Sequence, residues 1–510
     1  MDVTSMFERS VSRTPDRDAV VDVATGERHT YEELAAEVES VAAGLVDRGI
    51  GPGDRVAVSM ANRPEHAATF LATQRVGAVA VPFNFRLPAD DVDYHLRDSS
   101  PSAFVFDDLS REAVERAQSG GGLDCGTRVH VGDDTPSFAE PYGEFRGGSL
   151  AGDAPEVGPD DPSVILYTSG TTGDPKGIPI SREATVARTL SNSLGQGYYL
   201  RETMLGVMPL YHTVGLHGIL CSMMAASGTY LCMPEFDPGV AVRTIDAEGV
   251  TALHEAPTIF RHMLNADAVE GASLDTVATV AYSGAPMDRT LFEAVDGAFD
   301  PERFTNVYGN TETYDPLEFV DLRTVDEPTV VGNSHTFHRT RIVDLDAADP
   351  AETVAPGVEG ELVVHTDSPA SFSGYLNEPE ETRKAIVDGW YFTGDAAYER
   401  EDGNVVVTGR ADDLVISGGE NVHPAEVEDV LTAHADVTEV GVVGSPSEEW
   451  GEIVKAYVDG DATAEVLDEW CREHDGLADF KRPREYEFVE KIPRNPSGKI
   501  MRYRLRQDDG

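Results

Sequence analysis

A loop rich in glycine and hydroxyl side chains follows the apolar segment Val164-Ile165-Leu166. Its small residues let backbone N–H groups approach phosphate oxygens, and Lys176 adds a cation. A polar surface turn would have a similar composition. The loop is not a Walker A sequence, because no Gly-Lys-Ser/Thr follows at the required spacing. The residues that indicate phosphate binding are Thr168, Ser169, Gly170, Thr171, Thr172, Gly173 and Lys176.

Five further segments combine turn-forming residues with charged or hydroxyl-bearing ones. The first contains Gly284 and Pro286, which shape a bend against which a flat base can lie. Read alone, each segment is as well explained by an ordinary turn or by acidic residues exposed on a surface loop. The segments are Tyr282-Ser283-Gly284-Ala285-Pro286, Asn306-Val307-Tyr308-Gly309-Asn310-Thr311-Glu312, Trp390-Tyr391-Phe392-Thr393-Gly394-Asp395, Gly409-Arg410-Ala411-Asp412-Asp413 and Pro493-Arg494-Asn495-Pro496-Ser497-Gly498-Lys499.

In this order, the motifs resemble those of the adenylate-forming superfamily, which comprises acyl-CoA synthetases, adenylation domains of peptide synthetases and luciferases. The motifs span residues 164–502, and weaker similarity reaches Thr30-Tyr31-Glu32-Glu33-Leu34. The resemblance implies that ATP activates a carboxylic acid to an acyl-adenylate. It also implies Mg²⁺, which prefers carboxylate and phosphate oxygens together.

The resemblance assigns nucleotide-site roles to individual residues. Tyr308 would stack on adenine, Thr311 would contact the α-phosphate, and Glu312 would hold Mg²⁺ together with Thr168. Lys499 would reach the acid carboxylate and the α-phosphate, and Asp412 would be the hinge. The other residues implied at the ATP or AMP site are Ser283, Gly284, Ala285, Pro286, Asn306, Gly309, Asp395, which would bind ribose, and Arg410.

A second set of motifs is similar to aryl and small-acid CoA ligases, particularly the 4-chlorobenzoate type. These motifs are 208–215, 416–424, 449–451 and 478–483. They imply that His212 lies beside the acyl carboxylate, although a hydrogen-bonded histidine at the edge of an apolar helix would look the same. They also imply a coenzyme A site, whose arginines could instead simply complement nearby acid. The residues implied there are Gly418, Gly419, Trp450, Phe480, Arg482 and Arg484.

The identity of the acid is open at this stage. The segments 313–316 and 333–338 depart from the commoner family patterns, so a benzoate-type specificity does not transfer directly. Aryl acids, medium-chain fatty acids and small hydroxy acids all remain candidate substrates. Loading of a carrier protein, luciferase-like oxidation and non-catalytic binding of nucleotide or acyl-adenylate are the alternative functions. The acyl pocket is predicted from His212, Val214, Ser283, Gly309, Asn310 and Tyr314.

The elements that would position these residues follow from the hydrophobic pattern. Apolar residues recur at helical spacing over 34–45, and 55–59, 79–82 and 103–106 read as buried strands. Strands that alternate with helices predict an α/β fold with largely parallel, doubly wound sheets. The pattern becomes β-rich over 328–408. A smaller α+β unit follows over roughly 413–510. With the hinge that the resemblance implies at Asp412, we expect a large domain over 1–411, with a β-barrel-like part, and a small mobile α+β domain over 412–510.

The amino-acid composition indicates the environment of the protein and the partners that it does not bind. The 510 residues carry 91 Asp and Glu against 40 Lys and Arg, a formal net charge of −51. Such acidity, spread along the chain, resembles cytoplasmic proteins of extreme halophiles and disfavours nucleic acid as a partner. No apolar run reaches the length of a membrane span, so no membrane association is expected. Four scattered cysteines suggest a reducing cytoplasm. The oligomeric state is open, a homodimer included.

Overall fold

The structure is a computed structural model. It describes residues 2–121, 125–150, 154–168, 175–317, 319–325, 328–418, 420–447, 450–474, 477–494 and 500–507. The chain divides into two compact units. Unit 1 comprises Met1–Thr168, Lys176–Thr340 and Val364–Gly389, and unit 2 comprises Ser169–Pro175, Arg341–Val363 and Trp390–Gly510.

The first sheet of unit 1 has seven strands in the order β7-β6-β5-β3-β4-β8-β9. All neighbours are parallel except β8 and β9, which form an antiparallel pair around the predicted phosphate loop. Side chains of β3, β4 and β5 are almost all buried, as expected of parallel strands covered by helices on both faces. The strands are β3 (Arg55–Ser59), β4 (Val79–Pro82), β5 (Ala103–Asp107), β6 (Thr127–Val131), β7 (Glu140–Pro141), β8 (Pro162–Thr168) and β9 (Lys176–Ser181).

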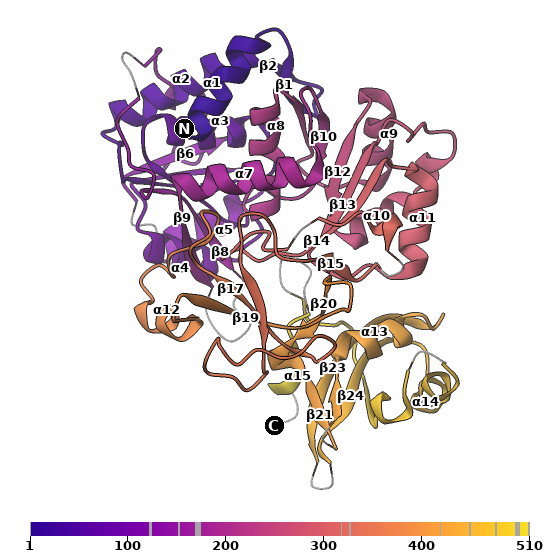
Figure 1. Cartoon of the computed structure of the whole chain (residues 1–510). Coiled ribbons are helices and arrows are strands. Elements are labelled where there is room, and N and C mark those ends of the chain that lie inside the picture. The colour runs from indigo at the N-terminus through magenta and orange to yellow at the C-terminus, as the bar shows by residue number, and fades with distance from the viewer. Residues whose placement is uncertain are drawn as a thin grey trace. The chain divides into compact units, whose positions relative to one another are not determined.

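The second sheet of unit 1 also has seven strands, in the order β14-β13-β12-β10-β11-β1-β2. The N-terminal strand β1 pairs in parallel with β11, more than 200 residues later, with Val20 opposite Tyr230. Helices α9, α10 and α11 lie beside β12, β13 and β14 (Figure 1). The strands are β1 (Asp18–Asp22), β2 (Arg28–Thr30), β10 (Thr203–Gly206), β11 (Thr229–Cys232), β12 (Ala252–Glu255), β13 (Thr279–Ser283) and β14 (Arg303–Val307).

Local signals define the helices of unit 1. Helix α2 begins with a capping box in which the Thr30 hydroxyl accepts from Glu33 N–H and the Glu33 carboxylate accepts from Thr30 N–H. Prolines occupy the first turns of α3, α9 and α10, where no N–H partner is needed. The α-helices are α1 (Val3–Arg13), α2 (Tyr31–Asp47), α3 (Pro64–Arg75), α4 (Ala89–Ser99), α5 (Arg111–Ser119), α6 (Tyr142–Phe145), α7 (Arg182–Gln196), α8 (Ser222–Ala226), α9 (Pro238–Glu248), α10 (Pro257–Leu264), α11 (Arg289–Phe299) and α12 (Pro379–Ala385). Unit 1 also contains the π-helix η1 (Val214–Cys221) and the short helical turns η2 (Asp267–Val269) and η3 (Leu322–Thr324). Its two remaining short strands are β15 (Val330–Gly332) and β18 (Ile386–Val387).

Unit 2 contains two groups of strands. In the first, β20, β19, β17 and β16 are neighbours in that order. In the second, the antiparallel pair β23 and β24 packs with α13 and α14 around a core that includes Val427, Val442 and Leu467. The elements are β16 (Thr340–Val343), β17 (Gly360–His365), β19 (Trp390–Glu399), β20 (Val405–Arg410), β21 (Val415–Ser417), β22 (Glu420–Val422), β23 (Val437–Ser447), β24 (Gly451–Gly460), β25 (Glu485–Phe488), α13 (Pro424–Thr432), α14 (Ala464–Glu473), α15 (Arg502–Gln507) and the turns η4 (Ala411–Asp413) and η5 (Asp479–Lys481).

The predicted fold class is confirmed: parallel α/β sheets fill the larger N-terminal part, and a small α+β part follows. The predicted boundary between residues 411 and 412 stays a prediction. The two compact units divide the chain differently, since residues 341–363 and 390–411 belong to the same unit as the C-terminal strands. This division does not test the predicted boundary, because a hinge is the point about which two domains rotate, and compactness does not report rotation. Over the described ranges, no helix is both long enough and apolar enough to span a bilayer.

Candidate active site

A closed turn follows β14 and carries the predicted magnesium ligand. Asn310 and Tyr314 pair across it, with Asn310 N–H donating to Tyr314 O at 3.1 Å and Tyr314 N–H donating to Asn310 O at 2.9 Å. The Asn310 side chain also accepts from Thr313 N–H at 2.8 Å. A Cβ on Gly309 would lie 1.7 Å from Tyr314 O, so only glycine fits there. This turn fixes Thr311 and Glu312 just beyond the carboxyl end of a parallel strand, where α/β sheets bind ligands.

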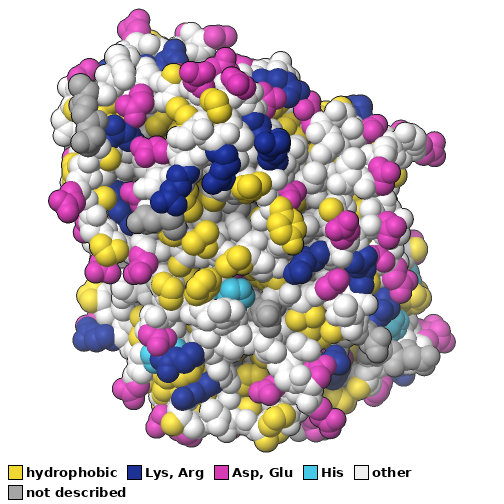
Figure 2. Space-filling model, turned by 45° about the horizontal axis from the view of Figure 1, so that its top comes forward, with side chains coloured by type: hydrophobic (Ala, Val, Ile, Leu, Met, Phe, Trp, Pro, Cys, Tyr) yellow, Lys and Arg dark blue, Asp and Glu magenta, His cyan; other side chains and the backbone are white. Residues whose placement is uncertain are grey.

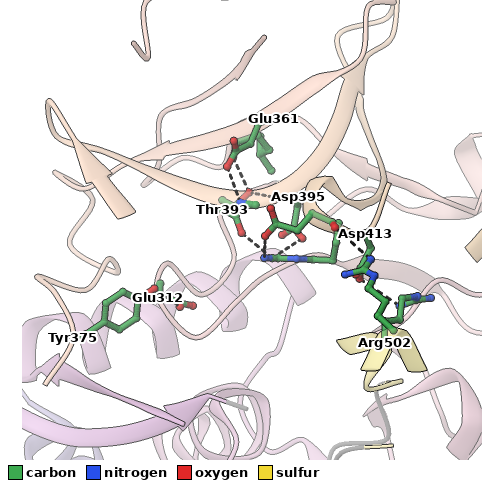
Figure 3. A network of polar contacts seen from close by, with 12 residues as sticks. Glu312, Glu361, Tyr375, Thr393, Asp395, Asp413 and Arg502 are labelled. Atoms are coloured by element: carbon green, nitrogen blue, oxygen red, sulfur yellow. Dashed lines mark hydrogen bonds and ion pairs between the residues drawn. The ribbon is translucent and has the colours of Figure 1, made fainter. Parts of the chain in front are cut away.

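Glu312 itself is buried and held from both its backbone and its side chain. Its carboxylate accepts from the Tyr375 hydroxyl at 2.9 Å (Figure 3), and its carbonyl accepts from Phe372 N–H at 2.7 Å. The Arg188 guanidinium donates to the same carbonyl at 3.2 Å. An oriented carboxylate fits Mg²⁺ when phosphate supplies further oxygen ligands. Thr168, the second predicted metal ligand, is the last residue of β8.

Lys176, the cation of the predicted phosphate loop, bonds to a carboxylate in this structure. Its ammonium lies 2.7 Å from Glu381, and Lys384 bonds to the other oxygen of Glu381 at 2.8 Å. The hydrogen bonds from Lys176 and Lys384 lower the pKa of Glu381 to about 2. A phosphate group would compete with Glu381 for Lys176. The rest of the loop (Ser169, Gly170, Thr171, Thr172 and Gly173) lies outside the described residues.

The predicted adenine-contacting turn lies at the end of the neighbouring strand. Ser283 ends β13 and is in register with Val307 of β14, so 283–286 and 306–309 meet at one sheet edge. Gly284 has φ +86, which lets the chain leave the sheet sharply before Ala285 and Pro286. Asn306 donates to Pro328 O at 3.2 Å. The sheet therefore brings together the two segments predicted to bind adenine, including Tyr308.

His212 and Val214 stand at the start of the π-helix η1. The His212 Nδ1 accepts from Val214 N–H at 3.3 Å. A Cβ on Gly215 would lie 2.1 Å from Pro209 O, so this glycine is needed for the tight entry into the helix. π-Helical turns are rare and are frequently found at functional sites. The structure thus brings His212 to an unusual helix start.

Two buried histidines, one in η1 and one on β12, were not predicted from the sequence. His217 lies within η1 and bonds to the Thr213 hydroxyl at 2.9 Å, and His254 on β12 lies 3.2 Å from the Ser283 hydroxyl. Burial lowers the pKa of both rings, to about 3 for His254, and the charge of Arg188 lowers the pKa of His217 further. The position of His254 at the carboxyl end of a parallel strand is the one sequence signal that could have identified it.

In unit 2, the predicted ribose and phosphate residues form an ordered cluster. Arg410 donates to Thr393 O at 2.8 Å and to Asp395 at 3.1 Å (Figure 3). Glu361, which was not predicted, accepts from Gly394 N–H at 2.8 Å. Burial, and then the charges of Asp412 and Asp395, raise the pKa of Glu361. The predicted hinge, Asp412, is an exposed residue of the turn η4 and lies 3.9 Å from Arg410.

The predicted coenzyme A residues lie on the strands and turns of unit 2. Gly418 N–H donates to Trp450 O at 2.9 Å, and a Cβ on Gly418 would lie 2.8 Å from the Trp450 ring. Trp450 and Phe480 are exposed. Arg482 pairs with Asp468 and Asp479, and Arg484 bonds to Asp479 O at 3.1 Å. These arginines therefore have acidic neighbours already, and a phosphate would have to displace them. Gly419 and the predicted catalytic Lys499 lie outside the described residues.

Comparison with known proteins gives matches along nearly the whole chain. The model of the AMP-binding enzyme family matches residues 7–376, and that of the AMP-binding enzyme C-terminal domain matches residues 426–499. The chain is 35% identical over 503 residues to a 4-chlorobenzoate–CoA ligase of Arthrobacter sp., covering 98% of this chain and 93% of the relative. It is 33% identical to a feruloyl-CoA synthase of Amycolatopsis sp., covering 96% of each. ATP-bound MatB from Rhodopseudomonas palustris has a similar structure, with a TM-score of 0.85, 28% identity and coverage of 100% and 99%.

Proposed function

The chain belongs to the AMP-binding enzyme family, and we propose that it activates a carboxylic acid with ATP and transfers the acyl group to coenzyme A. Curated relatives that match nearly the full chain are CoA ligases. The observation that carries the proposal is the closed turn 309–314, which holds Thr311 and Glu312 at the carboxyl end of β14 beside the turn 283–286.

In the first step, a carboxylate oxygen of the acid attacks the α-phosphorus of ATP, and the bond from that phosphorus to pyrophosphate breaks. Thr311 donates to the α-phosphate, and Lys499 offsets the repulsion between the two approaching anions. Glu312 and Thr168 would hold Mg²⁺, which neutralises charge on the phosphates. Tyr375 orients the Glu312 carboxylate for this role through its hydrogen bond.

In the second step, the sulfur of coenzyme A attacks the acyl carbon. The bond between this carbon and the AMP oxygen breaks, AMP leaves, and the thiol proton passes to solvent. We assign the approach of the pantetheine arm to Gly418 and Gly419, and contacts with the nucleotide end to Trp450, Phe480, Arg482 and Arg484. Rotation of the small domain about Asp412 would exchange Lys499 for this face.

The cysteines and the net charge indicate in which compartment the enzyme works and what it binds. All four cysteines are buried and none of them forms a disulfide, as in proteins of a reducing compartment, so we propose the cytoplasm. A net charge of −51 opposes binding to nucleic acid. The partners are the acid, ATP and coenzyme A, and a homodimer is compatible with this role.

Substitution of Lys499 tests the two-step assignment. Lys499→Ala should slow adenylate formation by about two to three orders of magnitude, the scale on which lost electrostatic stabilisers act. Transfer from supplied acyl-adenylate to coenzyme A should survive, because Lys499 has no part in it. Acid-dependent pyrophosphate release measures the first step, and thioester formation from acyl-adenylate measures the second.

The matched control is Lys491→Ala, which removes a lysine from the same C-terminal segment and outside the proposed site. It should leave both steps near wild-type rates. An equal loss of both steps in Lys499→Ala would contradict the assigned role. Thioester formation with a phosphopantetheinyl carrier protein but not with coenzyme A would contradict the proposed acceptor while leaving the adenylation step standing.

A further inference from the structure

The segment 494–500, which contains Lys499, is closed at its base. Its two end residues pair as an isolated antiparallel bridge, and just beyond them Met501 N–H donates to Pro493 O at 2.8 Å. The described residues on the two sides of the segment therefore meet at one place. The position of this base limits the positions that Lys499 can reach, because only one peptide bond separates the lysine from the bridge.

A small apolar core holds the base of the segment against β23 and β24. Ile492 before the segment and Leu505 after it are buried in one cluster with Val443 and Tyr457. Gly441 of β23 permits the close approach, since a Cβ there would lie 2.8 Å from the Leu505 side chain. Apolar contacts of this kind attach α15 to the sheet, but they are not directional.

Arg502, the third residue after Lys499, adds directional contacts to three elements. Its Nε donates to Val442 O of β23 at 3.1 Å, and its Nη2 donates to both carboxylate oxygens of Glu428 on α13 at 2.7 Å. Its Nη1 lies 3.6 Å from the carboxylate of Asp413 in the turn η4 (Figure 3). The guanidinium holds its donors in a fixed planar fork, so the three elements together determine the orientation of Arg502.

Stability alone does not explain this buried ion pair. The side chains of Arg502 and Glu428 are 17% and 13% exposed, and burial raises the pKa of Glu428 although the charge of Arg502 opposes the shift. The cost of removing two charges from water offsets their attraction, so such a pair adds little to the free energy of unfolding. An apolar side chain in place of Arg502 would extend the core around Leu505 without this cost. What the pair supplies is a defined orientation.

The same network reaches the predicted hinge. Asp413, the neighbour of Asp412, lies 3.6 Å from Arg502 and 3.0 Å from Arg506, and both arginines belong to α15. Arg506 also donates to Asp412 O at 3.4 Å. The helix that follows Lys499 is therefore joined directly to the turn that contains the hinge residue.

We propose that Arg502 is a positioning residue for adenylate formation, and that it fixes the base of the segment carrying Lys499 through its contacts with Glu428 and Asp413. The proposal rests on the proposed function, in which Lys499 stabilises the transition state of the first step. Arg502 acts only through Lys499. Misplacement of a reacting or stabilising group by about 1 Å can slow a reaction about 100-fold, even when the substituted residue is distant.

Arg502→Ala tests the proposal in the full-length enzyme, in molar KCl, with whichever of benzoate, 4-chlorobenzoate and hexanoate the wild type converts fastest. Acid-dependent pyrophosphate release should slow by about ten- to hundred-fold through kcat, with KM for ATP and for the acid near the wild-type values. Transfer from supplied acyl-adenylate to coenzyme A should stay near the wild-type rate. A purely structural defect would slow this transfer as well, because Gly418 and Trp450 belong to the same α+β part.

The Lys499→Ala background shows whether Arg502 acts through Lys499. Once the lysine is absent, Arg502 has nothing to position, so the double variant should form adenylate no more than about two-fold more slowly than Lys499→Ala alone. Losses that multiply in the double variant would show that Arg502 acts independently of Lys499 and would overturn the proposal.

Arg504→Ala is the matched control, because it removes an exposed arginine from the same helix, where the guanidinium lies over the neighbouring Tyr503 ring. Both steps should keep their wild-type rates. If Arg502→Ala does not fold, as judged by circular dichroism, Arg502→Met combined with Glu428→Gln carries the same test, since it leaves neither charge buried alone.

Unchanged adenylate formation in a folded Arg502 variant, or an equal loss of both steps, would also overturn the proposal. These outcomes leave the wild-type activity in place and so differ from failure of the proposed function. A wild-type enzyme that formed AMP from no carboxylic acid would contradict the proposed function itself.

Discussion

At the scale of single residues, the position of Glu312 is fixed by contacts from three directions. Tyr375 bonds to its carboxylate, Phe372 N–H and Arg188 bond to its carbonyl, and the turn closed by Asn310 and Tyr314 constrains its backbone. A metal ligand held in this way loses little conformational freedom when an ion binds. The rigidity of the surroundings therefore supports the role proposed for Glu312.

Two substitutions separate the charge of Glu312 from its orientation. Glu312→Gln removes the charge and should lower the adenylation rate by about 10²- to 10³-fold, with a higher Mg²⁺ requirement. Tyr375→Phe keeps the charge and removes one hydrogen bond, so its loss should be closer to ten-fold. Pyrophosphate release, measured against Mg²⁺ concentration, gives both values.

The control for this pair is Glu293→Gln, on an exposed position of α11. It should match the wild type, because it makes the same chemical change away from the proposed site. Equal activity and an equal Mg²⁺ requirement for wild type and Glu312→Gln would exclude Glu312 as the metal ligand.

Sequence motifs predicted the residues at strand ends better than the residues buried behind them. Ser283 and Gly309 could be predicted to meet, because they follow parallel strands whose carboxyl ends share one edge of a sheet. His217 and Arg188 lie within helices, where a histidine or an arginine alone indicates no site. Their burial results from tertiary packing between α7, η1 and the turn after β14, which local sequence patterns do not encode.

At the scale of elements, one carboxylate connects several strands of unit 2. Glu359 precedes β17 and accepts from Thr408 of β20 at 2.7 Å, from Asn421 of β22 at 3.2 Å and from His423 before α13 at 2.7 Å. Burial raises the pKa of Glu359, but these hydrogen bonds outweigh burial and lower the pKa to about 2. Glu359 thus stabilises the arrangement of β20, β22 and α13 within this unit.

The lowered pKa of Glu359 predicts how its contribution to stability depends on pH. The folded-state pKa, about 2, lies below the ordinary value of 4.5, so the stabilisation is present above pH 4.5 and is lost as the pH falls toward 2. Glu359→Gln should therefore lower the free energy of unfolding by on the order of 1–3 kcal/mol at pH 7, and by less at pH 3.5. Urea unfolding at the two pH values measures the difference.

Glu401→Gln, at an exposed turn of the same unit, serves as the reference for this series. Its effect should be small at both pH values, since this carboxylate is exposed. A deficit for Glu359→Gln that stayed constant or increased on acidification would show that the carboxylate is not ionised in the folded protein.

Local patterns predicted individual strands but not all of their partners. The segments 55–59 and 79–82 form β3 and β4 with the predicted bounds, because continuous apolar residues suit a strand buried on both faces. The pairing of β1 with β11 was not predicted. A strand of five residues carries no local information about a partner more than 200 residues away, so its place in the sheet is decided by packing.

At the scale of the whole molecule, charge sets the conditions in which the enzyme must work. Acidic side chains are scattered over the visible face and not gathered in one patch (Figure 2). With a net charge of −51, their mutual repulsion destabilises the folded state in dilute buffer. At molar salt the Debye length falls to about 3 Å, and this repulsion is screened. We propose that the protein is adapted to high salt.

This adaptation predicts a strong dependence on KCl. Both the melting temperature and the rate of AMP formation should rise from dilute buffer to molar KCl. Sucrose at equal osmolality should reproduce little of the effect, because it does not screen charge. Maximal activity and stability in dilute buffer would exclude the adaptation to salt and leave the catalytic assignment unchanged.

The most direct test of acyl-adenylate chemistry follows an oxygen atom from the acid. The acid is supplied with ¹⁸O in its carboxylate, together with ATP, coenzyme A and Mg²⁺, and the products are analysed by mass spectrometry. Attack of the carboxylate on the α-phosphorus places one ¹⁸O in AMP, and the other stays in the thioester carbonyl. Unlabelled AMP, or label in inorganic phosphate with ADP as the nucleotide product, would contradict the account.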